Sequence, residues 1–92
     1  MPIRHETLQI RTQGQGTYEF TRELERLLER SGLKDGLLSA LCQHTSCSLV
    51  LMENADPSAR KDLEAYMKRL VPEEAPYFTH TAEGPDDMPS HI

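Results

Sequence analysis

"NADPSARKDLEAYMKRLVP", from Asn54 to Pro72, is the stretch that decides the local fold most clearly. Asp56 stands where a helix N-cap is expected, and Pro57 suits the first helical position because its missing N–H would have no partner there. Pro72 then ends the helix. The apolar residues recur at helical spacing and form one stripe: Ala59, Leu63, Tyr66, Met67 and Leu70. The stretch therefore predicts an amphipathic helix with one buried side.

A second helix is predicted earlier in the chain, from about residue 22 to 31. Thr21 has the side chain of a helix N-cap, and leucines follow it at helical spacing. Gly32 stands where the left-handed residue after a helix is usually found. Thr21 and Gly32 thus define the predicted ends of this helix.

The remaining apolar stretches predict strands. "ETLQIRTQG" (Glu6–Gly14) alternates polar and apolar residues, and a short strand from Tyr18 to Phe20 would pair with it as a hairpin. "GLLSALCQ" (Gly36–Gln43) and "CSLVLME" (Cys47–Glu53) are too short for successive helices and too apolar for strands with one solvated face. With no repeat or linker, these elements predict one domain over residues 1–92.

Composition bounds the core that this domain can form. The chain has 92 residues, of which 37% are hydrophobic, and it contains no tryptophan. A chain of this size buries only roughly 60 to 70% of the surface that its unfolded form exposes. A thin core of this kind favours completion by other subunits, so we expect a homo-oligomer.

Charge and hydropathy exclude several classes of partner. The net charge is −5, and the basic residues mostly alternate with acids along the predicted helices, which argues against nucleic-acid binding. No apolar run approaches the ~18 residues that cross a bilayer, and the start has no signal-peptide pattern. We expect no membrane contact and a cytoplasmic location. Cys42 and Cys47 lack CxxC spacing and are expected to be buried, reduced thiols.

Three histidines in polar loops are the first candidates for chemistry: His44 in "QHTS", His80 in "FTHT" and His91 in "PSHI". Neutral imidazole is the commonest metal ligand, and three would suit zinc with a fourth position open. Their spacing matches no fixed metal motif. The alternative is therefore that they are separate loop histidines whose rings bond to backbone carbonyls.

Polar groups near these histidines offer further roles. Asp56, Asp86 and Asp87 could orient a ligating imidazole or act as a general base. Asp56 has a competing structural role as the cap of the helix that follows it. Asn54 could bind a ligand through its amide or close a local turn. The residues alone leave these alternatives open.

Five motifs in this order resemble the YjbQ-like family, also called secondary thiamine-phosphate synthases: "HTS", "ENADP", "LVPE", the histidine of "FTHT", and "GPDDMPSHI". The resemblance extends from about Tyr18 to the end. It implies an α+β fold with a layered mixed β-sheet core and two main flanking helices, assembled as a trimer with pockets near the subunit contacts. Members of the family continue with further C-terminal strands, including a glycine-threonine-tryptophan-glutamine segment, that this sequence lacks, so the domain is expected to be C-terminally incomplete.

The resemblance also implies one pocket containing three metal ligands, two catalytic carboxylates and two substrate-binding groups. In that order, they are His44, His80 and His91; Asp56 and Asp87; and Asn54 and Asp86. A divalent metal, zinc or magnesium, and a small phosphorylated ligand would bind there. The implied reaction joins a hydroxymethylpyrimidine diphosphate to a thiazole phosphate. The alternatives are a non-catalytic metal- or phosphate-binding oligomer and a metal-dependent hydrolase of a small phosphorylated molecule.

Overall fold

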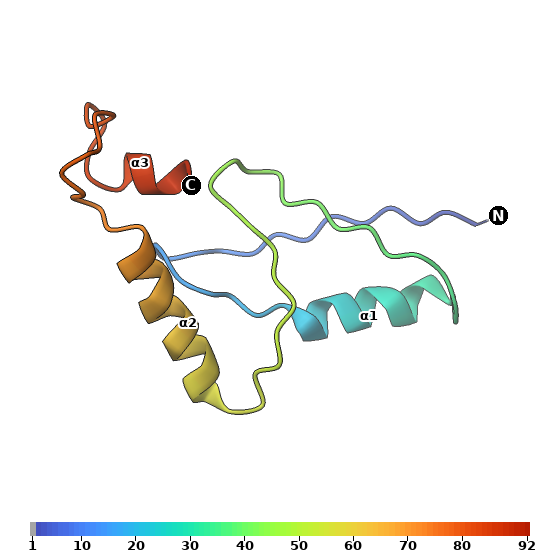
Figure 1. The fold of residues 1–92 in the computed structure, drawn as a ribbon. Coiled ribbons are helices and arrows are strands. Elements are labelled where there is room, and N and C mark those ends of the chain that lie inside the picture. The colour runs from blue at the N-terminus through green and yellow to red at the C-terminus, as the bar shows by residue number, and fades with distance from the viewer. Residues whose placement is uncertain (1) are drawn as a thin grey trace. The chain divides into compact units, whose positions relative to one another are not determined.

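The computed structural model describes residues 2–92. Their regular elements are three helices: α1 (Thr21–Ser31), α2 (Pro57–Leu70) and α3 (Asp87–Ser90) (Figure 1). The chain divides into two compact units, Met1–Ser39 and Ala40–Ile92, each described by itself. α1 belongs to the first unit, whereas α2 and α3 belong to the second. The prediction of one domain over residues 1–92 stays a prediction.

α1 confirms the predicted helix and its end. Gly32 adopts the left-handed conformation with φ of 72°, and its backbone N–H donates to the Glu29 carbonyl at 3.2 Å. The predicted cap is wrong by one residue. Phe20 is the N-cap, because its carbonyl accepts the first helical hydrogen bond, from the Leu24 N–H at 3.1 Å. Its side chain makes no capping hydrogen bond. Thr21 is therefore the first helical residue.

α2 confirms the helix predicted from Asn54–Pro72. Asp56 is its N-cap and accepts a hydrogen bond from the Ser58 backbone N–H at 2.9 Å, with Pro57 in the first turn. Val71 closes the helix by donating its N–H to the Met67 carbonyl at 3.0 Å. These bonds satisfy backbone groups that a helix terminus otherwise leaves without partners.

The buried side predicted for α2 is wrong. None of its residues is buried: Leu63 is half-buried, while 61% of Tyr66 and 57% of Leu70 are exposed. An amphipathic stripe becomes buried only where another layer packs over it. Among residues 2–92, Ala75 is the hydrophobic residue that is buried, with 7% exposure.

The predicted layered mixed β-sheet core is also wrong, because residues 2–92 contain no β-strand. The hairpin predicted near the N-terminus is reduced to its turn. Tyr18 Oη donates to the Gly14 carbonyl at 2.7 Å and accepts from the Gln13 N–H at 2.8 Å. A side chain, rather than a ladder of backbone bonds, closes this turn, so the flanking segments do not pair as strands.

The two apolar segments predicted as buried strands are solvent-exposed. Leu37 in Gly36–Gln43 is 97% exposed, and Leu51 in Cys47–Glu53 is 100% exposed. Sheet pairing needs a partner brought from elsewhere in the fold, and a strand's own sequence cannot supply it. These segments carry the composition of core strands without a neighbour that covers them.

The cysteine prediction is wrong as well. Cys42 and Cys47 form a disulfide with a Cα–Cα distance of 6.4 Å. Cys42 is half-buried and Cys47 is exposed, so neither thiol is enclosed by apolar packing. The bond closes a short loop that contains His44.

Throughout residues 2–92, every helix is too short or too polar to cross a bilayer.

Candidate metal centre

Two turns before α3 bring distant polar residues together. Gly84, with φ of 111°, donates its N–H to the Thr81 carbonyl at 3.4 Å and accepts from the Asp87 N–H at 3.4 Å. This positive φ favours glycine over other residues. The chain reverses here, so α3 returns toward His80. The "GP" step thus shapes the site, as its turn chemistry suggests.

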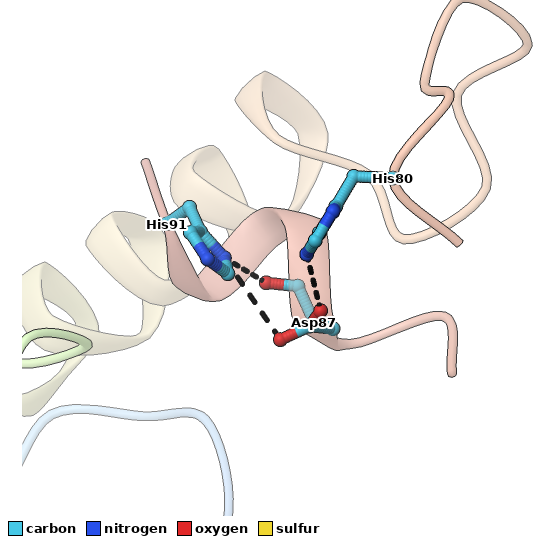
Figure 2. A group of neighbouring side chains, drawn as sticks. All are labelled: His80, Asp87 and His91. Carbon is cyan, nitrogen blue, oxygen red and sulfur yellow. Dashed lines mark hydrogen bonds and ion pairs between the residues drawn. The ribbon is translucent and has the colours of Figure 1, made fainter. Parts of the chain in front are cut away.

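His80, Asp87 and His91 form a cluster in which one potential ligand atom of each residue lies within 4.8 Å of the other two (Figure 2). His80 Nε2 lies 2.7 Å from Asp87 Oδ2, and His91 Nδ1 lies 3.9 Å from Asp87 Oδ1. The two imidazole rings stand edge to face, with centroids 4.9 Å apart. Asp87 therefore lies within reach of both rings.

The backbone of α3 fixes the orientation of His91. Its Nδ1 lies 2.8 Å from the Asp87 carbonyl oxygen, four residues earlier. A carbonyl can only accept, so Nδ1 carries the hydrogen and donates it. In the neutral ring, Nε2 then has the free lone pair. A ring held by a hydrogen bond from its other nitrogen is the usual arrangement of a metal-binding histidine.

The burial of Asp87 supports a cation at this cluster. Its side chain is 18% exposed, against 52% for His80 and 54% for His91. Asp87 Oδ2 is itself buried and accepts no well-directed hydrogen bond, although His80 Nε2 lies 2.7 Å away. The charge of this buried oxygen is compensated either by a protonated His80 or by a bound cation. Two imidazoles and one carboxylate fit zinc, whose ligands stand about 3.3 Å apart in a tetrahedron, so His80 and Asp87 must separate slightly.

His44, predicted as the third histidine ligand, is not part of this cluster. Its ring is exposed, and Nδ1 accepts from the Ser46 backbone N–H at 3.0 Å. The Ser46 hydroxyl also lies 2.7 Å from Nδ1. The proposed contribution of His44 to the metal centre stays a prediction.

The other predicted site residues lie in different local settings. Asp56 caps α2, and the hydrogen bonds from the Ser58 N–H and then the Ser58 hydroxyl hold the pKa of its carboxyl below the ordinary value of 3.8. Asn54 is half-buried just before that cap. Asp86 is exposed at the N-cap position of α3, next to Asp87 in the chain. The structure thus brings together three of the seven predicted site residues: His80, Asp87 and His91.

An open cavity of about 420 Å³ lies in the same unit and was not predicted from the sequence. Glu73 and Glu74 contribute its acidic groups, while Thr81 and Gly84 belong to the turn that follows His80. The sequence from Glu73 to Pro85 has no helical or strand periodicity, so the cavity could not be located from it. Only the repeated glycine and proline turns could have indicated a concave surface there.

Comparison with known sequences places the chain in a family. The family described as "UPF0047 protein YjbQ-like" matches residues 6–92. The chain belongs to the YjbQ-like UPF0047 family. The resemblance seen in the sequence motifs is therefore confirmed over most of the chain.

Several curated proteins are similar to this YjbQ-like chain. The UPF0047 protein sll1880 of Synechocystis is 42% identical over 95% of this chain and 59% of its own length. YjbQ of Escherichia coli O157:H7 is 45% identical over 94% of this chain and 62% of its own length. YugU of Bacillus subtilis is 34% identical over 72% of this chain. No solved structure matched. The chain spans about three fifths of the first two relatives, and these names state no reaction.

Proposed function

We propose that this YjbQ-like chain binds a divalent cation through His80, Asp87 and His91, and binds a small phosphorylated molecule beside it. The observation that carries the proposal is the convergence of both imidazoles on Asp87, whose buried Oδ2 accepts no directed hydrogen bond. Zinc suits two nitrogens and one oxygen better than magnesium, which prefers oxygen ligands.

The three residues would contribute different groups to metal binding. His80 and His91 would each contribute a neutral nitrogen, and Asp87 would contribute the negative charge. When bound, the cation would offset charge on phosphate oxygens. Glu73 and Glu74 in the nearby cavity would repel a phosphorylated ligand in the absence of that positive charge. Phosphate binding should therefore depend on the metal.

The finer proposal is a thiamine-phosphate synthase-type condensation, carried by the family resemblance. Asp86 and Asn54 would contact the substrate, and Asp56 or Asp87 would orient groups or move a proton. Asp56 already serves α2 as its cap, so Asp87 is the better placed of these two. We also propose a homo-oligomer, a trimer by the resemblance, in the cytoplasm, with His44 reaching the pocket only through a rearranged loop.

Metal binding is tested by zinc titration of the purified chain, followed by calorimetry. We expect one equivalent bound at this centre, and His91→Ala should weaken its affinity at least 10-fold. His5→Ala is the matched control, because His5 is exposed and lies in the first unit. Equal zinc affinity in wild type and His91→Ala, with unchanged helix content, would remove these ligands from the proposal.

Catalysis is tested separately by turnover of the two phosphorylated precursors with and without zinc. Metal-dependent product formation that is lost in His80→Ala supports the transferase. Metal binding without turnover favours the non-catalytic alternative, a metal- or phosphate-binding oligomer. Release of inorganic phosphate from a panel of phosphate esters would indicate a hydrolase instead.

A further inference from the structure

The loop closed by Cys42 and Cys47 contains a second set of metal-binding groups. It reads Cys-Gln-His-Thr-Ser-Cys, with His44 between the two cysteines. Residues 40–52 form no regular helix or strand. Cys47 is exposed, and Cys42 is half-buried. Two sulfurs and an imidazole thus belong to six consecutive residues.

We propose that this loop is a redox-gated metal site, in which the reduced form binds a thiophilic divalent cation such as zinc. The ligands are Cys42 Sγ, Cys47 Sγ and one ring nitrogen of His44. In the disulfide form both sulfurs are bonded to each other and the site is closed. The proposal does not rest on the metal centre at His80, Asp87 and His91.

The separation of the two cysteines suits the two sulfur ligands. The two cysteine Cα atoms are 6.4 Å apart. A tetrahedral zinc ion with Zn–S bonds of about 2.3 Å holds two sulfurs about 3.8 Å apart. Rotation of the two side chains can give that separation without moving the backbone ends of the loop far. Three protein ligands leave one position for water or another ligand.

Ser46 can determine which nitrogen of the neutral His44 ring carries the hydrogen. At present its backbone N–H donates to Nδ1 at 3.0 Å, which places the neutral ring's hydrogen on Nε2. The Ser46 hydroxyl, 2.7 Å from Nδ1, can accept a hydrogen from that nitrogen instead. The tautomer that results presents an unprotonated Nε2 to a metal, and its other nitrogen stays anchored.

Opening the site requires thiol–disulfide exchange with an external thiol of the glutathione or dithiol class. Two thiols of the reductant lose two electrons and two protons and become a disulfide, while Cys42 and Cys47 become thiols. Metal binding then displaces the two thiol protons. The exposure of Cys47 gives an attacking thiolate access to the bond. In a reducing cytoplasm the open form would be favoured.

Cobalt titration tests this site because thiolate ligands give Co²⁺ an intense near-ultraviolet charge-transfer band, which nitrogen and oxygen ligands lack. Protein reduced with glutathione, and then separated from it without oxygen, should develop the band to one equivalent, and zinc should displace it. The disulfide form should show none. Cys47→Ser should abolish the band, and His44→Ala should weaken cobalt affinity about 10-fold or more.

His91→Ala is the control that separates the two sites, and it should leave the band unchanged. A reduced wild-type protein without the band overturns the metal site. Thiol counting that finds the disulfide intact in excess glutathione overturns its gating. Failure of the His80 centre in calorimetry would leave both results for this loop unaffected.

Discussion

At the scale of single residues, Asp87 does most of the work in the candidate metal centre. Its side chain meets His80, while its backbone carbonyl holds the His91 ring. The sequence shows two adjacent aspartates, Asp86 and Asp87, with equal chemistry. The turn at Gly84 and the start of α3 decide between them: Asp87 lies in the cluster with the two histidines (Figure 2), and Asp86 is not a member of it.

This difference predicts unequal effects of two matched substitutions. Asp87→Asn should reduce zinc affinity at least 10-fold, because it removes the charge of the buried oxygen. Asp86→Asn changes an exposed neighbour and should reduce affinity by less than about 2-fold, since its carboxylate is outside the cluster. Calorimetry on both variants measures the difference. Equal losses would show that net charge, rather than ligation, controls zinc binding.

Asp56 gives a prediction about pH. Hydrogen bonds from Ser58 lower the pKa of its carboxyl below 3.8. A carboxyl with a lowered folded-state pKa stabilises the folded form above its unfolded pKa, and this contribution is lost as pH falls through the lowered value. The start of α2 should therefore fray in acid at a pH below about 3.8. Backbone NMR shifts of residues 57–60 should show this, and Asp56→Ala should show the frayed shifts already at neutral pH.

At the scale of elements, α2 is stabilised more by the hydrogen bonds at its two ends than by packing of its apolar stripe. Its caps are local hydrogen bonds, whereas the stripe through Leu63 and Tyr66 is only partly covered. The sequence predicted both features from the same 19-residue stretch, Asn54–Pro72, and only the first is confirmed. A cap needs partners two to four residues away, but a buried stripe needs another layer.

The half-burial of Leu63 sets the expected cost of a charge there. Leu63→Asp should lower the free energy of unfolding by about 1 kcal/mol, less than the several kcal/mol expected for a fully buried site. Lys61→Ala, at an exposed position of the same helix, should change it by less than about 0.5 kcal/mol. Denaturant unfolding followed by helix signal compares them. A loss of several kcal/mol in Leu63→Asp would mean that a partner covers the stripe in solution.

At the scale of the whole molecule, the chain exposes more surface than a folded monomer of its mass. The accessible surface is 8789 Å² for a 10.5 kDa protein. Folded monomers of that mass expose about 5400 Å². The excess agrees with the exposure of the apolar segments around Leu37 and Leu51. Association between chains, as proposed above, would reduce it.

This excess predicts self-association through the second apolar segment. Sedimentation should show an oligomer whose population rises with concentration, and Leu51→Lys should lower its association because an ammonium group would be buried without a partner. Ile3→Lys is the control: Ile3 is also exposed, at 85%, but lies in the first unit. Monomers at every concentration in wild type would contradict the oligomer.

The sequence by itself determined family membership, the two longer helices, and the local signals at Asp56 and Gly32. Each of these signals acts through the torsion of one residue or through hydrogen bonds to groups a few residues away. The residues adjacent in the sequence are therefore enough to predict it. Only the tertiary structure decided that Cys42 joins Cys47, that His80 and His91 meet at Asp87, and that the apolar segments stay unpaired. Those outcomes depend on which groups the folded chain brings together in space, and on whether a second layer is present to cover them.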